Sequence, residues 1–179
     1  MSAPAFTIRE ARAGDVEQIH QRILDLAAYE REPDAATGTA EDLRAALFGD
    51  DPAVFCHVAE VEHTEGADSG PRIAGIALWF LTYSTWEARH GIWLEDLFVV
   101  PENRGTGMGL ALLRTLAGIC RERGYRRLEW CVLDWNEPSI RFYESVGARP
   151  QSDWTTYRLT GEALASFAPA AYPSAPRAR

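Results

Sequence analysis

The sequence predicts a mixed α/β (α+β) fold, and three observations carry this prediction. Residues 54–61 and 72–83 are rich in apolar and β-branched side chains and flank a polar turn, which predicts an antiparallel hairpin. Residues 92–100 form a further apolar strand that leads through a glycine-rich turn into a helix. Helical periodicity precedes and follows these strands, so helices and strands are mixed along the chain.

The N-terminal part contains a predicted strand and two predicted helices. Residues 6–9 alternate in polarity, as a strand does. Asp15 is a candidate N-cap for a helix whose apolar residues share one face and which ends near Glu30. Thr39 and Asp42 have the spacing of a capping box at the start of a second, short helix.

The predicted central strand, residues 92–100, carries two carboxylates, Glu95 and Asp96, inside an apolar run. An ionised carboxylate in such a run is costly unless it has a function or a partner. Neighbouring residues of a regular strand point to opposite faces, so we expect Asp96 to lie away from Glu95, in a structural role or a dimer contact. The turn between the two hairpin strands, residues 62–71, is polar and expected to be exposed.

The C-terminal part alternates between helices and strands. The helix after the glycine-rich turn is expected to end at Gly124. Residues 127–133 predict a strand, residues 136–146 a short helix that Asn136 begins, and residues 154–159 a last strand. A short terminal helix is expected from residue 160.

Length and composition describe one globular domain. The chain has 179 residues, of which 46% are hydrophobic, so we expect a single domain over residues 1–168. The Ala/Pro-rich tail, residues 169–179, is expected to be disordered. A net charge of −8 disfavours nucleic acid as a partner and suits a cationic small substrate, although solubility alone also explains it.

Location and metal content follow from the same composition. The chain shows no secretion signal and no apolar run of about 20 residues that could span a membrane, which predicts a cytoplasmic protein. Cys56, Cys120 and Cys131 lack metal-type spacing and lie in apolar segments, so we expect buried thiols in a reducing compartment. The histidines form no ligand pair at helical spacing, so no metal site is expected.

The glycine-rich turn, Arg104 to Gly109 (RGTGMG), predicts an anion site, because a helix N-terminus offers free N–H groups and a positive dipole end. A Walker loop needs Lys-Ser/Thr next, and Leu110 follows instead. Glu129 stands about 20 positions on, as in a Rossmann unit, but the turn comes after a hairpin and two helices, with too little chain left. A turn needed only for tight packing stays an alternative.

Four segments resemble a known family: residues 26–30 (LAAYE), 94–99 (LEDLFV), 104–109 (RGTGMG) and 135–143 (WNEPSIRFY), the last followed by Gly147 and Ala148. The glycine turn resembles the acetyl-CoA pyrophosphate loop of the GNAT superfamily of N-acetyltransferases. Together the segments resemble its diamine (spermidine/spermine) and thialysine branch. The resemblance implies a mostly antiparallel sheet, splayed at the central strand and covered by helices on both faces, and a homodimer.

The resemblance implies acetyl-CoA as co-substrate, with no metal. The N–H groups of the glycine turn would bind the pyrophosphate, the central strand would pair with the thioester arm, and the sheet would splay between residues 97–99 and 130–132. The residues implied in cofactor binding are Leu97, Phe98, Val99, Arg104, Gly105, Thr106, Gly107, Met108, Gly109, Leu110, Asn136, Ser139 and Tyr143.

For catalysis, the resemblance implies direct attack of an amine on the thioester. Glu95 would accept the amine proton and Tyr143 would protonate the leaving thiolate. A carboxylate paired with an arginine is the alternative for Glu95, and a core aromatic the alternative for Tyr143. The residues implied in substrate binding are Tyr29, Glu30, Glu95, Glu129, Trp130 and Cys131.

The expected substrate is a primary amine of a small molecule, a diamine, polyamine or amine-bearing amino acid. Thr155 stands where the diamine enzymes are expected to carry a second substrate carboxylate, which leaves a shorter amine or an amino acid with a side-chain amine open. Two other functions stay open as well. One is a protein or peptide acetyltransferase, and the other is an acyl-CoA sensor without turnover, which the presence of both Glu95 and Tyr143 disfavours.

Overall fold

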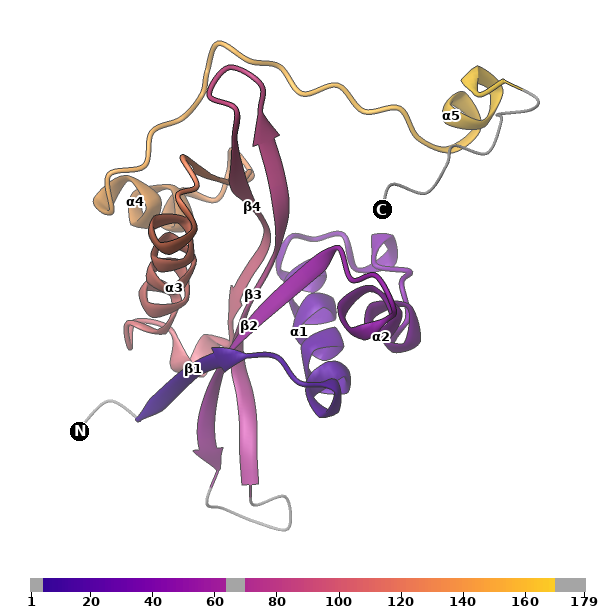
Figure 1. Cartoon of the computed structure of the whole chain (residues 1–179). Helices are drawn as coiled ribbons and strands as arrows, with labels where there is room; N and C mark the ends of the chain where they lie inside the picture. The colour runs from indigo at the N-terminus through magenta and orange to yellow at the C-terminus, as the bar shows by residue number, and fades with distance from the viewer. Residues whose placement is uncertain (1–4, 64–69, 170–179) are drawn as a thin grey trace. The chain divides into compact units, whose positions relative to one another are not determined.

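A computed structural model of the chain describes residues 5–63 and 70–169 (Figure 1). The chain divides into two compact units, Met1–Cys131 and Val132–Arg179, and each is described by itself. The prediction of a single domain over residues 1–168 stays a prediction. The middle of the polar turn and the tail from residue 170 lie outside the described residues.

The first unit contains a five-stranded sheet in the order β1-β2-β3-β4-β5. Its strands are β1 (Phe6–Glu10), β2 (Val54–His63), β3 (Gly70–Ser84), β4 (Arg89–Val99) and β5 (Leu128–Glu129). The first four strands pair antiparallel with their neighbours, and β5 pairs parallel with β4. The predicted hairpin is therefore confirmed, as is a mixed and mostly antiparallel sheet.

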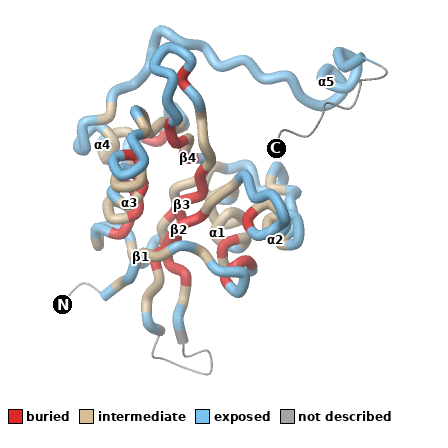
Figure 2. Tube along the Cα trace, in the orientation of Figure 1, coloured by how far each residue is buried: buried red, intermediate tan, exposed pale blue. Residues whose placement is uncertain are grey.

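Helices cover both faces of this sheet. Figure 1 shows α1 (Val16–Tyr29) and α2 (Ala40–Phe48) on one side of the strands and α3 (Met108–Arg123) on the other. Buried positions run through the central strands and along α1 and α3 (Figure 2). The largest fully buried side chains are Val16, Ile19, Val58, Ile73, Ile76, Ile92, Leu94, Met108, Leu112 and Leu116.

Local sequence signals explain where these helices begin and end. The hydroxyl of Thr39 accepts a hydrogen bond from the Asp42 N–H (3.1 Å), and the Asp42 carboxylate accepts one from the Thr39 N–H (3.0 Å), which confirms the capping box. Gly124 ends α3 in the left-handed conformation, at φ 70°. Asp15 precedes α1 but does not cap it with its side chain, which pairs with Arg9 at 2.6 Å and accepts a 2.7 Å hydrogen bond from the Arg12 N–H.

β5 is shorter than expected. The sequence predicts a strand over residues 127–133, whereas the ladder to β4 has only the pairs Ile92–Leu128 and Trp93–Glu129 among the described residues. A strand needs a hydrogen-bonded neighbour, and β4 and β5 stop pairing at this point. The two strands therefore separate along the second half of β4, as the splayed sheet requires.

The second unit contains α4 (Glu137–Ser145) and α5 (Gly161–Phe167). The Asn136 side chain accepts a hydrogen bond from the Ser139 N–H (3.4 Å) and caps α4 as expected. The predicted strand at 154–159 is wrong, because these residues have no regular structure and their side chains are exposed. No strand is present among the described residues of this unit, so an extended segment has no neighbour to pair with.

Candidate active site

The loop between β4 and α3 has a backbone that only glycine adopts easily. After the 3-10 turn η3 (Pro101–Asn103), Gly105 and Gly107 have φ values of 76° and 87°. This left-handed region is unfavourable for residues with a Cβ atom. The Thr106 hydroxyl between them donates a 2.7 Å hydrogen bond to the Asn103 carbonyl and fixes the turn. A Cβ atom at Gly105 or Gly107 would meet no atom within 4 Å, so the loop faces open space.

The N–H groups of this loop have no acceptor in the described part of the chain. From Gly105 to Leu110, no amide donates a hydrogen bond to any residue within 5–63 or 70–169. The Ala111 N–H is the first to find a partner, at 2.9 Å from the Gly107 carbonyl. These free donors lie at the positive end of the 16-residue α3. The loop can therefore bind a phosphate group through its main chain.

The second half of β4 offers a free strand edge beside this loop. The Val100 N–H donates to Ala74 of β3 at 2.9 Å, so the backbone groups of the preceding residue, Val99, point to the opposite edge. The backbone N–H and C=O groups of Leu97 point to this same edge, because the direction of the backbone groups alternates from residue to residue along a strand. The side chain of Phe98, between them, is 4% exposed. This edge has no β5 partner among the described residues, so an extended ligand can pair with the backbone groups of Leu97 and the Val99 N–H, whereas the Val99 carbonyl already accepts a bond from Arg104.

Arg104 turns toward α1. Its Nε donates a 3.0 Å hydrogen bond to the Val99 carbonyl. The guanidinium carbon lies 4.8 Å from the ring centre of Tyr29 and 5.5 Å from that of Phe98, which are cation–π distances. The resemblance implies that Arg104 contributes to cofactor binding. In the structure, its guanidinium instead lies against Tyr29, the last residue of α1.

A β-bulge places both strand carboxylates on one face. Leu78 pairs with Asp96 and Trp79 pairs with Leu94, so Glu95 is an extra residue in β4. Because Leu78 and Trp79 point to opposite faces, Leu94 and Asp96 do so as well, and Asp96 shares the face of Trp93. The Trp93 indole Nε1 donates a 2.8 Å hydrogen bond to Glu95 Oε2. The expectation that Asp96 lies away from Glu95 is wrong, because it assumed a regular strand.

These two carboxylates lie near a third one, Glu30, at the C-terminal end of α1. Burial, with repulsion from Glu95 and Glu30, raises the pKa of Asp96 to about 6. Burial also raises the pKa of Glu30. Glu95 itself is exposed and takes part in no ion pair among the described residues. Three acidic side chains on the α1 side of the sheet suit a cationic amine.

The other predicted substrate residues lie at and after β5. Glu129 forms an ion pair with Arg127, at 2.8 Å between Oε2 and Nε, and its backbone pairs with Trp93. Trp130 is half-buried. Cys131 is exposed, which corrects the expectation that all cysteines are buried, because β5 ends at Glu129 before reaching it. Cys56 and Cys120 are buried as expected.

Three predicted site residues belong to the second unit. Asn136 is 6% exposed and occupies the N-cap of α4, one turn before Ser139. Tyr143 is half-buried in α4, with its ring centre 5.3 Å from that of Phe142. Their predicted roles toward cofactor and leaving group stay predictions.

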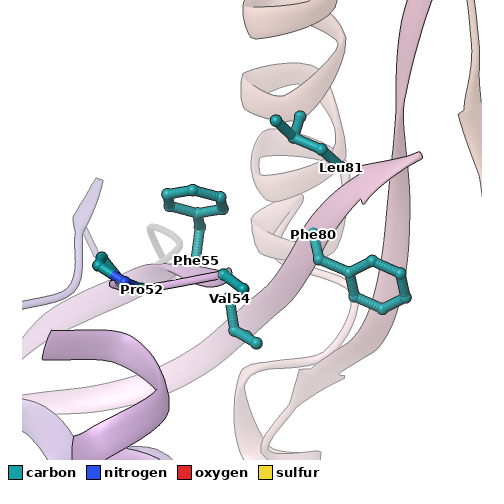
Figure 3. A pocket seen from close by; sticks show the side chains of 6 residues that line it. Pro52, Val54, Phe55, Phe80 and Leu81 are labelled. Carbon is teal, nitrogen blue, oxygen red and sulfur yellow. The ribbon is translucent and has the colours of Figure 1, made fainter. Parts of the chain in front are cut away.

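An apolar hollow lies elsewhere on the first unit (Figure 3). It is formed at the start of β2 and the end of β3 and is lined by Pro52, Ala53, Val54, Phe55, Phe80 and Leu81. Because none of these side chains carries a charge or titrates, the hollow offers no group for proton transfer.

Across the described residues, no cluster of three or more His, Cys, Asp or Glu side chains could hold a metal ion. No helix in that part of the chain could cross a membrane.

Comparison with known proteins decides the family. Residues 18–148 match the model of the Acetyltransferase (GNAT) family. The chain belongs to this family. It is therefore an acetyl-transferring enzyme. The free amides before α3 belong to the glycine turn that resembles the acetyl-CoA loop of this family.

Named relatives cover almost all of the chain. It is 38% identical to thialysine N-epsilon-acetyltransferase from Bos taurus, over 90% of this chain and 96% of the relative. It is 30% identical to L-ornithine N5-acetyltransferase NATA1 from Arabidopsis thaliana, over 88% of this chain and 85% of the relative. An integron cassette protein from V. cholerae is 24% identical, with a TM-score of 0.72, and covers 93% of this chain and 98% of its own.

The structure adds two residues that sequence patterns did not assign to the site. Asp96 joins it through the bulge, and Trp93 joins it by holding Glu95. Two adjacent carboxylates inside an apolar strand were the available signal, because a bulge can place both side chains on one face. The side chain of Arg104 gave no such signal, since its direction depends on the loop backbone.

Proposed function

We propose that this GNAT enzyme moves an acetyl group from acetyl-CoA to a primary amine of a small molecule by direct attack. The observation that carries the proposal is the continuity between two features of one short segment. The strand that bears Glu95 and Asp96 leads within a few residues to the free amides of residues 105–110. A cofactor bound through its phosphates and a cationic acceptor would thus be held by neighbouring parts of the segment that runs from β4 into α3.

The proposed chemistry has three proton transfers. An alkyl ammonium group with a pKa near 10 loses its proton to Glu95, directly or through water, and the free amine attacks the thioester carbonyl. An N–H group at the free edge of β4 stabilises the oxyanion that forms. When the carbon–sulfur bond breaks, Tyr143 donates its proton to the thiolate, and the nitrogen releases its second proton to the tyrosinate, directly or through water, which leaves a neutral amide. Trp93 supports the first transfer by fixing one oxygen of Glu95.

The proposed acceptor is a diamine, a polyamine or an amino acid with a side-chain amine. The acidic cluster of Glu30, Glu95 and Asp96 supports a cationic acceptor, because it would concentrate positive charge near the thioester. The named relatives support an amino acid, since their names give thialysine and L-ornithine as the substrates. A human spermidine/spermine N(1)-acetyltransferase-like protein, 36% identical over 91% of this chain and 24% of that protein, supports a polyamine.

The proposal extends to location and assembly. The thiols of Cys56, Cys120 and Cys131 are free, which supports the reducing cytoplasm. The GNAT branch that the sequence resembles supports a homodimer. Light scattering of the purified protein tests the second point, and a monomeric mass would contradict it.

Thiol release from acetyl-CoA tests the reaction. We expect release with diamines, polyamines or lysine and ornithine analogues, and much less with peptides that carry a free N-terminus. Release with peptides alone would favour a protein acetyltransferase. Calorimetric binding of acetyl-CoA without thiol release from any amine would favour the sensor and overturn the proposal.

A further inference from the structure

Arg104 begins the glycine loop, yet its side chain lies against Tyr29 of α1 and Phe98 of β4. The Nε atom is used by the Val99 carbonyl at 3.0 Å. The rest of the guanidinium lies over the ring of Tyr29 at 4.8 Å and near the ring of Phe98 at 5.5 Å. In the described residues, Arg104 forms no ion pair with a carboxylate.

These contacts join the two elements that supply the acidic groups. Tyr29 is the last residue of α1 and precedes Glu30, whereas Phe98 follows Asp96 by two positions in β4. A planar cation stacked on one ring and bonded to a β4 carbonyl restricts the distance between these elements. The loop amides need no side chain to bind a diphosphate, because their donors are already unused.

We propose that Arg104 is a positioning residue of the amine site, which acts by holding Tyr29, and that it contributes little to binding of the cofactor phosphates. The inference rests on the proposed function, because it concerns the acceptor of that reaction. Removing the guanidinium leaves the loop amides in place but lets the end of α1 move away from β4. Affinity for the amine falls, and affinity for acetyl-CoA does not.

The test is a double-mutant cycle with two separate readouts. Arg104→Gln and Tyr29→Leu are each expected to raise the amine KM about two- to five-fold, the factor that an exposed cation–π contact supplies. The amine KM of the double variant is expected to be no higher than that of the more affected single variant, because both changes remove the same contact. The acetyl-CoA Kd, measured by calorimetry without amine, should stay within two-fold of wild type.

Two further variants separate positioning from general effects. Tyr29→Phe keeps the ring face and should preserve the coupling with Arg104. Arg72→Gln removes another exposed arginine, one that pairs with Glu102 of η3 at 3.0 Å, and should leave the amine KM unchanged. Thermal unfolding of each variant shows whether it is folded.

Three results would overturn the inference. They are a raised acetyl-CoA Kd with an unchanged amine KM in Arg104→Gln, additive effects in the double variant, and no effect on either constant. A wild-type protein that releases no thiol with any amine would refute the proposed function instead. Calorimetry of wild type and Arg104→Gln would still test the inference then, since weaker acetyl-CoA binding by the variant contradicts it.

Discussion

Trp93 holds Glu95 across the bulge of β4, with 2.8 Å between the indole Nε1 and the carboxylate Oε2. The two residues share a face of the strand, and the indole is a donor that cannot accept a proton. The bond therefore fixes one carboxylate oxygen, and because Glu95 is exposed, the other oxygen is accessible to an amine from the solvent.

Replacing either member of this pair should slow acetyl transfer, by different amounts. Glu95→Gln removes the proton acceptor and is expected to lower kcat about 100-fold or more. Trp93→Phe removes only the donor and is expected to lower kcat about five-fold. Steady-state thiol release at saturating acetyl-CoA measures both. Equal losses in the two variants would contradict separate roles as acceptor and support.

Asp96 should make the folded protein less stable as the pH rises. Its pKa is raised to about 6 by burial and by repulsion from Glu95 and Glu30, so the folded state binds this proton more tightly than the unfolded chain, where the pKa is about 3.9. Its contribution to stability is therefore full below pH 4 and lost between about pH 4 and 6. Asp96→Asn resembles the protonated form and should stabilise the protein by about 3 kcal/mol at pH 7.5.

Urea unfolding at pH 7.5 and pH 4 measures this difference. The gain from Asp96→Asn should be largest at pH 7.5 and nearly absent at pH 4. Asp51→Asn, at an exposed position before β2, serves as the control and should change stability little at either pH. A variant that is less stable than wild type by the same amount at both values would contradict the burial of a repelled charge.

The glycine loop should tolerate a side chain poorly at Gly107. Alanine at φ 87° is strained by about 1–2 kcal/mol, and relief of this strain would rotate the amides that face the open side of the loop. Gly107→Ala is expected to raise the acetyl-CoA Kd at least ten-fold, measured by calorimetry. Gly118→Ala, within α3, should instead stabilise the protein by about 0.5–1 kcal/mol and leave the Kd unchanged. Matching Kd values for Gly107→Ala and wild type would contradict phosphate binding by this loop.

Tyr143→Phe tests the proposed acid. Loss of the phenolic proton should lower kcat about 100-fold, because the thiolate then leaves unprotonated. The acetyl-CoA Kd should stay within two-fold of wild type. Tyr83→Phe, at the exposed end of β3, is the control and should keep full turnover. Full turnover in Tyr143→Phe would remove the assignment.

Features with a local cause could be predicted from the sequence. The capping box at Thr39, the helix end at Gly124 and the cap at Asn136 each depend on residues a few positions apart. The hairpin follows from two apolar segments around one turn. The glycine loop could also be predicted, because alternating glycines indicate a left-handed backbone and the apolar pattern after them indicates the start of a helix.

Features that depend on distant partners could not be predicted in this way. The strand expected at 154–159 has suitable residues but no neighbour in its unit. The direction of Arg104 depends on where α1 ends against β4. The bulge at Glu95 is a mismatch between two strands, so no periodicity within one strand reports it.

The extra residue in β4 has a consequence for how such an enzyme can change over time. Regular pairing resumes on both sides of Glu95, with Leu94 opposite Trp79 and Asp96 opposite Leu78. The extra residue, Glu95, thus adds an exposed carboxylate without shifting the register of the apolar residues on either side. Mutation can alter the reactive groups at this step in the ladder without disturbing the hydrophobic contacts around it, so new acceptor preferences can evolve on an unchanged scaffold.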